Sequence, residues 1–375
     1  MPAGALRSLA VMTGIVGALH AYIGWRLLPA LHLGDAGVAA TIALLIASAV
    51  LMPFSLLARF VVSDEHLADR LSWAGSLFMG LFSSLFMMTL LRDIALLLPH
   101  PAALERGSAA AVAALALLVT LIGFFNARSV AGVVHVDVPI AGLAPALAGF
   151  VIVQLSDIHV GPTIKRGYVD AIVRRANTLG ADVVAITGDV VDGSVPRLAR
   201  HTAPLGGLAS RHGTFIVTGN HEYYAGANAW MAEFRRIGMR SLMNEHVVLR
   251  HDGADLVLAG VTDFTAHHFD PAQASDPQRA LAGAPAGLPR VLLAHQPRSA
   301  DAASAAGFDL QLSGHTHGGQ FWPWNLFVPL QQPYTAGLHR LAKLWVYTSR
   351  GTGYWGPPKR FGAPAEITRL RLVAA

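Results

Sequence analysis

The sequence predicts two parts of different fold class: a four-helix transmembrane module over residues 1–129 and an α/β domain over residues 130–375. Three observations carry this prediction. The 375-residue chain is 53% hydrophobic and only 14% charged, whereas soluble domains contain about 25% charged residues. Its long apolar stretches lie before residue 130. Short apolar runs that end in polar or glycine-rich residues follow.

Four apolar stretches of about 20 residues each have the length that a helix needs to cross a bilayer. They cover residues 5–28, 37–58, 73–98 and 108–127. One such stretch alone is compatible with a buried helix of a soluble protein, but four in succession favour membrane spans. The first stretch also resembles a signal peptide, yet no clear small-residue cleavage site follows it. We interpret it as the first anchor of the module.

The arginines that flank the spans predict the orientation. Four lie on the side that carries the C-terminal domain and three on the other side: Arg7, Arg59, Arg70 and Arg128 against Arg26, Arg92 and Arg106. The positive-inside rule therefore favours a cytoplasmic α/β domain. A haem-binding bundle needs histidines on facing helices, but the first span contains His20 and the other three contain none. Arg92 and Asp93 can pair near one end of the third span, so we interpret the module mainly as an anchor.

Composition excludes several function classes. The chain has no cysteine, which rules out disulfides, thiolate catalysis and cysteine-ligated zinc. Its formal charge of +5 favours contact with phosphates or an anionic membrane surface. Nucleic-acid binding is not specifically indicated, because no basic run or aromatic-basic interleaving occurs.

The α/β domain is predicted from strands and helices in alternation. Residues 133–139 alternate in polarity as a strand does, and later apolar runs rich in Val, Ile and Leu have the pattern of buried strands. These runs cover residues 150–155, 183–186, 214–217, 256–261, 291–294 and 310–312. Residues 166–180 and 227–238 predict helices, and each ends at a glycine.

Polar side chains of ligand type follow five of the runs. They are Asp157 and His159, then Asp189, then Asn220 and His221, then His295, and finally His315 and His317. Each has an ordinary explanation by itself, because Asp and Asn are common in caps and turns and loop histidines are usually solvated. Ligand sites of open α/β sheets form at the carboxyl ends of strands. Together these residues predict a metal cluster there.

The same blocks in the same order resemble the calcineurin-like metallophosphoesterases. The matching stretches read "SDIH", "TGDVVD", "TGNHE", "AHQP" and "SGHTHGGQ" and span about residues 150–320. The wording "VQLSDIH" and the closing "VYTSRGTGYWGPPKRFGAPAEITRLRL" are most similar to the membrane-associated bacterial branch, which includes the YaeI and YkuE phosphoesterases. The four-span module lies outside the resemblance. The resemblance implies two stacked β-sheets flanked by helices, and an integral protein of the bacterial inner membrane.

The resemblance also implies a ligand set for two divalent metal ions. One ion is held by Asp157, His159, Asp189 and His317, and the other by Asp189, Asn220, His295 and His315. Asp189 bridges them. Imidazole and carboxylate ligands without thiolate favour Mn, Fe, Co or Zn over Ca or redox copper. His221 is the candidate acid that protonates the leaving oxygen, and Asp192 or Glu222 is expected to orient the ligands.

These expectations together describe a membrane-anchored hydrolase. It cleaves a phosphodiester or diphosphate by attack of a hydroxide that bridges the metals. The crowding of Trp322, Trp324, Phe327 and Leu330 after the last ligands favours a lipid-linked or otherwise amphiphilic substrate at the bilayer surface.

Two alternatives to this function remain. One is a phosphomonoesterase, protein phosphatase or nuclease on the same site, and another is a non-enzymatic membrane sensor or assembly protein with a structural metal domain. For Arg350, Lys359 and Arg360, the sequence allows either solvated surface charges or groups that bind an anionic head group.

Overall fold

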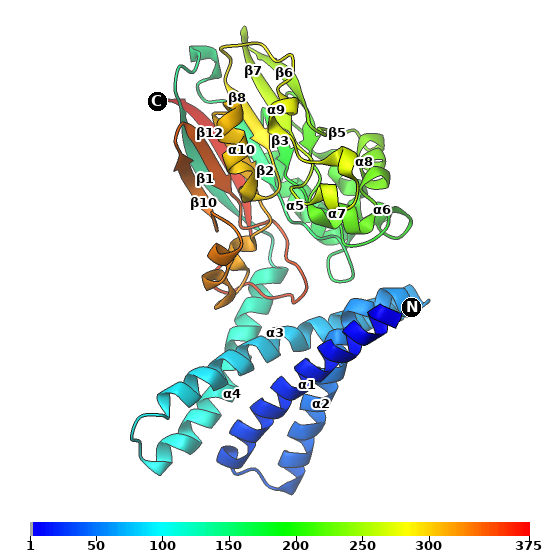
Figure 1. Cartoon of the computed structure of the whole chain (residues 1–375), viewed down its shortest axis with the longest axis vertical. Coiled ribbons are helices and arrows are strands. Elements are labelled where there is room, and N and C mark those ends of the chain that lie inside the picture. Colours follow the sequence, from blue (N-terminus) through cyan, green and yellow to red (C-terminus); the bar gives the residue numbers. More distant parts are fainter. Residues whose placement is uncertain (1–2) are drawn as a thin grey trace. The chain divides into compact units, whose positions relative to one another are not determined.

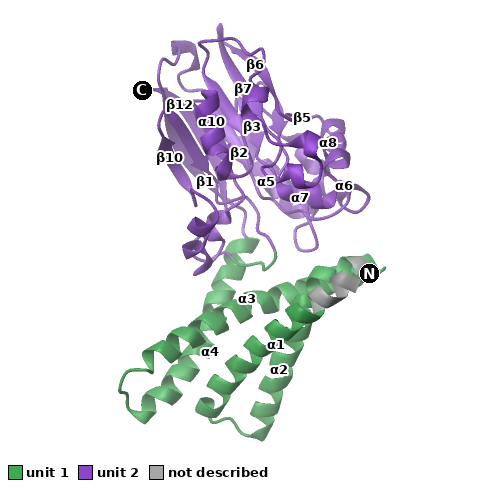
Figure 2. Cartoon of the chain, viewed as in Figure 1, with its two compact units in different colours: residues 1–128, 356–359 green, residues 129–355, 360–375 purple. Residues whose placement is uncertain are grey.

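The computed structural model describes residues 3–375 and separates into two compact units (Figures 1 and 2). The helical unit contains the chain up to Arg128 together with Gly356–Lys359, and the α/β unit contains Ser129–Trp355 and Arg360–Ala375. Residues 356–359 therefore pack with the helices, whereas the sequence alone assigns them to the α/β domain.

The helical unit consists of four helices, each long and apolar enough to cross a membrane. They are α1 (Ala3–Leu31), α2 (Asp35–Val61), α3 (Glu65–Ala95) and α4 (Ala102–Arg128). At 1.5 Å per residue, helices of this length reach about 40 Å and exceed the hydrocarbon core of a bilayer, about 30 Å. The predicted four-helix module is thus confirmed. The side chain of Arg7, one of the arginines that flank the spans, lies outside the described part of the structure.

Small residues let these helices pack closely. The buried face of α3 is rich in Gly and Ser, and Gly75 touches α2 so closely that a Cβ atom would clash with the carbonyl of Leu51. Such contacts are typical of helices that pack in a bilayer. Arg92 and Asp93 do pair, at 3.4 Å, and Arg26 of α1 lies 2.8 Å from the same carboxylate. This cluster ties α1 to α3.

The α/β unit contains two sheets, as the resemblance implies, and each is a mixed sheet of six strands (Figure 1). The first has the order β1-β12-β2-β3-β4-β5 and the second β10-β11-β9-β8-β7-β6. The strands of the first sheet are β1 (Gly132–Ile140), β2 (Val151–Leu155), β3 (Val183–Ile186), β4 (Thr214–Ile216), β5 (Arg240–Ser241) and β12 (Glu366–Ala374). Those of the second are β6 (Glu245–His251), β7 (Ala254–Gly260), β8 (Arg290–Leu293), β9 (Leu310–Ser313), β10 (Gly337–Leu341) and β11 (Leu344–Thr348).

Helices connect the strands of both sheets. They are α5 (Arg166–Ala176), α6 (Val195–Thr202), α7 (Asn220–Ala225), α8 (Ala227–Arg236), α9 (Pro277–Ala280) and α10 (Ala300–Ala306). The predicted helix at 166–180 is confirmed as α5, followed by a 3₁₀ turn that ends at Gly180 with φ 63°. Only a residue that tolerates the left-handed region stops a helix in this way, and glycine does so without a Cβ penalty.

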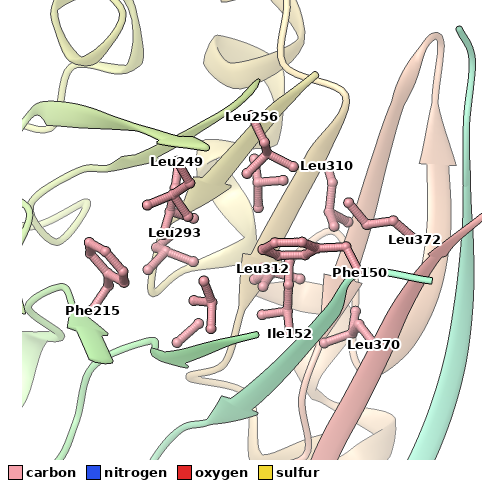
Figure 3. Packing of buried hydrophobic residues seen from close by; sticks show 14 of the residues in the cluster. Phe150, Ile152, Phe215, Leu249, Leu256, Leu293, Leu310, Leu312, Leu370 and Leu372 are labelled. Atoms are coloured by element: carbon pink, nitrogen blue, oxygen red, sulfur yellow. The ribbon is translucent and has the colours of Figure 1, made fainter. Parts of the chain in front are cut away.

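The hydrophobic core lies between the two sheets (Figure 3). Phe150, Ile152 and Phe215 contribute from the first sheet and meet leucines of the second, among them Leu256 and Leu312. Each of these side chains is nearly or fully buried, which stabilises the fold by about 1.5–3 kcal/mol per side chain.

A buried glutamine joins the two sheets at the carboxyl ends of their central strands. Gln154 of β2 donates hydrogen bonds from Nε2 to Thr187 Oγ1 at 2.8 Å and to the carbonyl of Ser313 at 2.9 Å. Thr187 follows β3, and Ser313 ends β9. The loops that leave β2, β3 and β9 therefore meet at one place, and this is where the predicted ligands lie.

Candidate metal centre

All eight residues that the sequence predicts for the site lie directly after strands of the two sheets. Those that follow the first sheet are Asp157, His159, Asp189, Asn220 and His221, and those that follow the second are His295, His315 and His317. Seven of them enter three groups of Asp and His side chains whose ligand atoms lie within 4.8 Å of one another.

The first group is Asp157, His159 and His317. Nε2 of His159 lies 3.0 Å from Nε2 of His317, and the latter nitrogen lies 3.5 Å from Oδ1 of Asp157. All three side chains are buried. These residues come from loops after β2 and β9, in different sheets.

The second group is Asp189, His295 and His315. Nε2 of His295 lies 3.1 Å from Oδ2 of Asp189 and 3.2 Å from Nδ1 of His315. Oδ2 of Asp189 also lies 3.9 Å from Nε2 of His159, in the first group. One carboxylate oxygen therefore faces both groups.

The hydrogen bonds behind the imidazoles suit metal ligation. Nδ1 of His295 lies 2.7 Å from the carbonyl of Thr187, which only accepts, so this nitrogen carries a proton and Nε2 is the nitrogen left to bind a metal. Nδ1 of His159 lies 3.0 Å from Oδ1 of Asp192, so Nε2 of His159 is likewise the nitrogen left to bind a metal. Nε2 of His159 and Nε2 of His295 are therefore placed to bind a cation.

The lowered pKa values of two histidines and an unsatisfied amide oxygen also suit bound metal ions. Burial, with His295 beside it, lowers the pKa of His315 to about 3, and burial and His159 hold the pKa of His317 well below its usual range. Both rings are therefore neutral, the form that binds metals. Oδ1 of Asn220 is buried and has no hydrogen-bond partner within the described residues 3–375. A divalent cation satisfies such an oxygen.

The backbone of the predicted ligands is strained. Five of these residues have positive φ, between 52° and 70°: Asp157, His159, Asp189, His315 and His317. A left-handed conformation costs a non-glycine residue about 1–2 kcal/mol, and such residues cluster at functional sites. Gly219 and Gly314 allow the loops to touch, because a Cβ atom would clash with the carboxylate of Asp189 or of Asp157, respectively. These conformations therefore lower the stability of the fold, but they direct the side chains into the site.

Glu222 fixes the turn that carries Asp189. Its fully buried carboxylate accepts hydrogen bonds from the backbone N–H of Gly219 at 2.7 Å, Asp189 at 2.9 Å and Val190 at 2.8 Å. Charge-assisted bonds of this kind are about twice as strong as neutral ones. Glu222 therefore holds the backbone of Asp189 rather than a ligand side chain.

His221 lies at the start of α7, beside the two groups. Its Nδ1 is 2.7 Å from Oδ1 of Asp192, and its Nε2 is 3.9 Å from Oδ2 of Asp189. Burial lowers the pKa of His221, but the carboxylates of Asp189 and Asp192 outweigh burial and raise it to about 9. The two carboxylates therefore favour the protonated ring, which is the form that a general acid requires.

We expect Asp192→Asn to shift the basic limb of the pH profile. Its Oδ1 accepts from both His159 and His221, and removal of the negative charge lowers the pKa of His221. A general acid is active while protonated, so kcat/KM of the variant falls at lower pH than that of the wild type. The measurement is kcat/KM against pH at saturating metal. Since His159 loses the same partner, metal affinity drops about 10–100-fold as well. An unchanged basic limb would contradict the pairing.

Lys359 and Arg360 do not have the surface roles that the sequence allows. Lys359 is buried in the helical unit, where Nζ donates to the carbonyl of Gly80 at 2.8 Å and to Ser84 Oγ at 2.6 Å. Arg360 is fully buried in the α/β unit and donates from Nη1 to the carbonyl of His317 at 2.9 Å. Neither side chain is open to a head group. Arg360 instead holds the loop of a predicted ligand.

Comparison with known proteins identifies the family of the α/β unit. A family model described as calcineurin-like phosphoesterase matches residues 150–319. A transmembrane protein with metallophosphoesterase domain from Bos taurus is 43% identical over 278 residues, which are 70% of this chain and 62% of that protein. The chain thus spans about three fifths of the length of this relative.

Two bacterial relatives are covered more fully. An uncharacterized metallophosphoesterase of Aquifex aeolicus is 33% identical over 223 residues, or 59% of this chain and 84% of that protein. YkuE of Bacillus subtilis, also an uncharacterized metallophosphoesterase, is 28% identical over 239 residues, or 60% and 79% of the two chains. The resemblance that the motifs predict is confirmed, and the chain belongs to the calcineurin-like metallophosphoesterase family.

Proposed function

We propose that this chain is a membrane-anchored two-metal phosphoesterase that hydrolyses a phosphodiester or a diphosphate. The position of Asp189 carries the proposal. Its Oδ2 lies 3.1 Å from His295 and 3.9 Å from His159, which belong to different ligand groups. A carboxylate shared in this way suits two cations a few ångströms apart, the arrangement of two-metal hydrolases.

The ligand types define the metals and their contribution. One ion is assigned to Asp157, His159, Asp189 and His317, and the other to Asp189, Asn220, His295 and His315. These oxygen and imidazole donors suit Mn, Fe, Co or Zn. Such ions, when bound, neutralise phosphoryl oxygens and lower the pKa of water so that hydroxide forms near neutral pH.

The protein supplies the proton for the leaving group. Asp192 holds His221 through Nδ1, which leaves Nε2–H free to turn toward the departing oxygen. The same carboxylate oxygen holds His159, so one residue aligns the acid with a ligand. Burial of the ligands excludes most water and strengthens each of these electrostatic contacts.

We propose that the natural substrate is amphiphilic and the bilayer a partner. The segment after the last ligands exposes Trp324, Leu326, Phe327 and Leu330. It packs on the turn of His317, because the backbone of Asn325 touches Gly319. Exposed apolar patches on folded proteins mark protein or membrane contacts. The excess of arginines on one side of the spans favours a cytoplasmic α/β unit, at the bacterial inner membrane.

The test is a substrate screen with the full chain in detergent, reconstituted with Mn²⁺. We expect bis(p-nitrophenyl) phosphate to be hydrolysed with a kcat/KM at least about tenfold above that of p-nitrophenyl phosphate. A preference for the monoester would overturn the diesterase proposal in favour of a phosphomonoesterase. No turnover of aryl, nucleotide or lipid phosphoesters by metal-loaded chain would support the sensor or assembly alternative.

A further inference from the structure

Three exposed aromatic residues form a cluster beside the acid His221. They are Tyr224, Phe269 and Trp355, which are 64%, 50% and 50% exposed, and we call them the aromatic seat. The ring centres of Tyr224 and Trp355 lie 5.1 Å and 5.6 Å from that of His221. Phe269 extends the cluster, 5.6 Å from Tyr224. Single exposed apolar residues are ordinary, but a contiguous patch beside reactive groups marks a binding surface.

Trp355 is held in place by a side chain of the metal loop. Gln320, three residues after His317, accepts from the backbone N–H of Trp355 and donates to its carbonyl, both at 2.9 Å. Gln320 is itself buried and has φ 58°. Strain and two hydrogen bonds at one residue indicate a constraint that serves a function. The exposed indole is therefore positioned with the metal loop.

The other two members of the seat are also fixed. Tyr224 lies one helical turn after His221 on α7, so the two side chains share a face. Tyr223, next to it, packs on Phe269 at 5.6 Å and donates from its hydroxyl to Gln273 Oε1 at 2.7 Å. This pair secures the loop that carries Phe269.

The position of the acid tells which part of a substrate meets the seat. A general acid lies beside the oxygen that departs, and Nε2 of His221 faces the ligand groups while Tyr224 and Trp355 contact the same ring. The leaving group consequently passes along these aromatic rings. A strongly polar alcohol gains little there, whereas an apolar one buries its surface.

We propose that the aromatic seat binds the lipid part of the substrate and that this part is the leaving group. The inference rests on the proposed function and adds which of the two ester P–O bonds is cleaved. The P–O bond to the lipid alcohol breaks, the oxygen of water forms the new P–O bond, and His221 gives its proton to the departing oxygen. A proton from water restores His221. A lipid is favoured over a nucleoside because the same chain carries four helices long and apolar enough to cross a membrane.

The experiment compares two diesters that differ only in their acyl chains, dioctanoyl-glycerophosphoglycerol and glycerophosphoglycerol, with full-length Mn²⁺-loaded enzyme. We expect dioctanoylglycerol and glycerol phosphate as products, and a kcat/KM at least about tenfold higher for the acylated diester. Trp355→Ala and Tyr224→Ala should each lower this ratio about tenfold, mainly through KM, and Trp355→Phe should restore most of it. Trp25→Ala removes a more exposed tryptophan, in the helical unit, and should leave the ratio unchanged.

The outcomes separate the inference from the function on which it rests. If bis(p-nitrophenyl) phosphate and both glycerol diesters are inert, the phosphoesterase proposal itself fails. If they are hydrolysed but the acyl chains do not raise kcat/KM, or the products are phosphatidic acid and glycerol, the seat is wrongly assigned. An unchanged acylated-to-deacylated ratio in Trp355→Ala, with total activity reduced, would show a merely structural role. Faster hydrolysis of a dinucleoside phosphate would assign the seat to a base.

Discussion

Replacement of Asp189 by asparagine is expected to remove both metal ions and to lower kcat/KM at least about a thousandfold. The carboxylate is buried, and its Oδ2 faces His295 at 3.1 Å and His159 at 3.9 Å. Burial raises the pKa of Asp189, but His295 and His221 outweigh it and hold this pKa well below its usual range. The residue is therefore an anion throughout the working pH range. An amide has no charge to offset two cations, and two-metal catalysis supplies several kcal/mol.

The measurement is elemental analysis of the purified full chain together with kcat/KM on bis(p-nitrophenyl) phosphate. Wild type should carry about two ions per chain and the variant close to none. Asp137→Asn is the matched control, because Asp137 pairs with Arg371 on an exposed strand at 2.8 Å. We expect it to keep metal and activity. An Asp189→Asn variant that retains two ions would contradict the bridging role, whatever its activity.

The positions after the buried strands could be predicted from the sequence because burial leaves a clear signal. A strand covered on both faces, such as β3, is a short unbroken apolar run, and in β2 only Gln154 interrupts the run. A charged or imidazole side chain directly after such a run, as at Asp157 or His295, is therefore conspicuous. The geometry of the sheet then brings the carboxyl ends of these strands together.

Pairings between distant segments could not be predicted in this way. β1 and β12 pair in parallel, with Val138 opposite Leu372. No local pattern encodes a partner more than two hundred residues away, because the alternation of a strand reports which face is buried and not which strand lies beside it. The short strand β5, of two residues, has no period to detect.

The burial of Arg360 leaves no signal in the sequence, for a different reason. Its guanidinium donates to the backbone carbonyls of Gly353, His317 and Ala363. Carbonyl acceptors belong to every residue and therefore leave no mark in the sequence, whereas a carboxylate partner does. A buried arginine that bonds mainly to backbone therefore resembles an ordinary surface charge in the sequence. Lys359 likewise donates to groups other than carboxylates, namely the carbonyl of Gly80 and the hydroxyls of Ser84 and Thr120.

The distinction between acid and ligand at His221 leads to the second large effect. His159, Asp189 and His221 also form a group that can hold an ion, so geometry alone permits either role. The carboxylates of Asp189 and Asp192 together raise the pKa of His221 to about 9, and a protonated imidazole does not bind metal. The role of an acid therefore predicts that metal content is independent of this side chain.

We expect His221→Ala to keep both metals and to lower kcat about 10²–10⁴-fold, because removal of a positioned acid costs this much. The loss should be larger for an alkyl diester than for bis(p-nitrophenyl) phosphate, since p-nitrophenolate departs without a proton. His135→Ala, on the exposed side of β1, controls for loss of an imidazole and should be silent. Elemental analysis and kcat for the two diesters show whether His221 is an acid or a metal ligand. Loss of an ion would make His221 a ligand, and a decrease below about threefold for both diesters would remove it from catalysis.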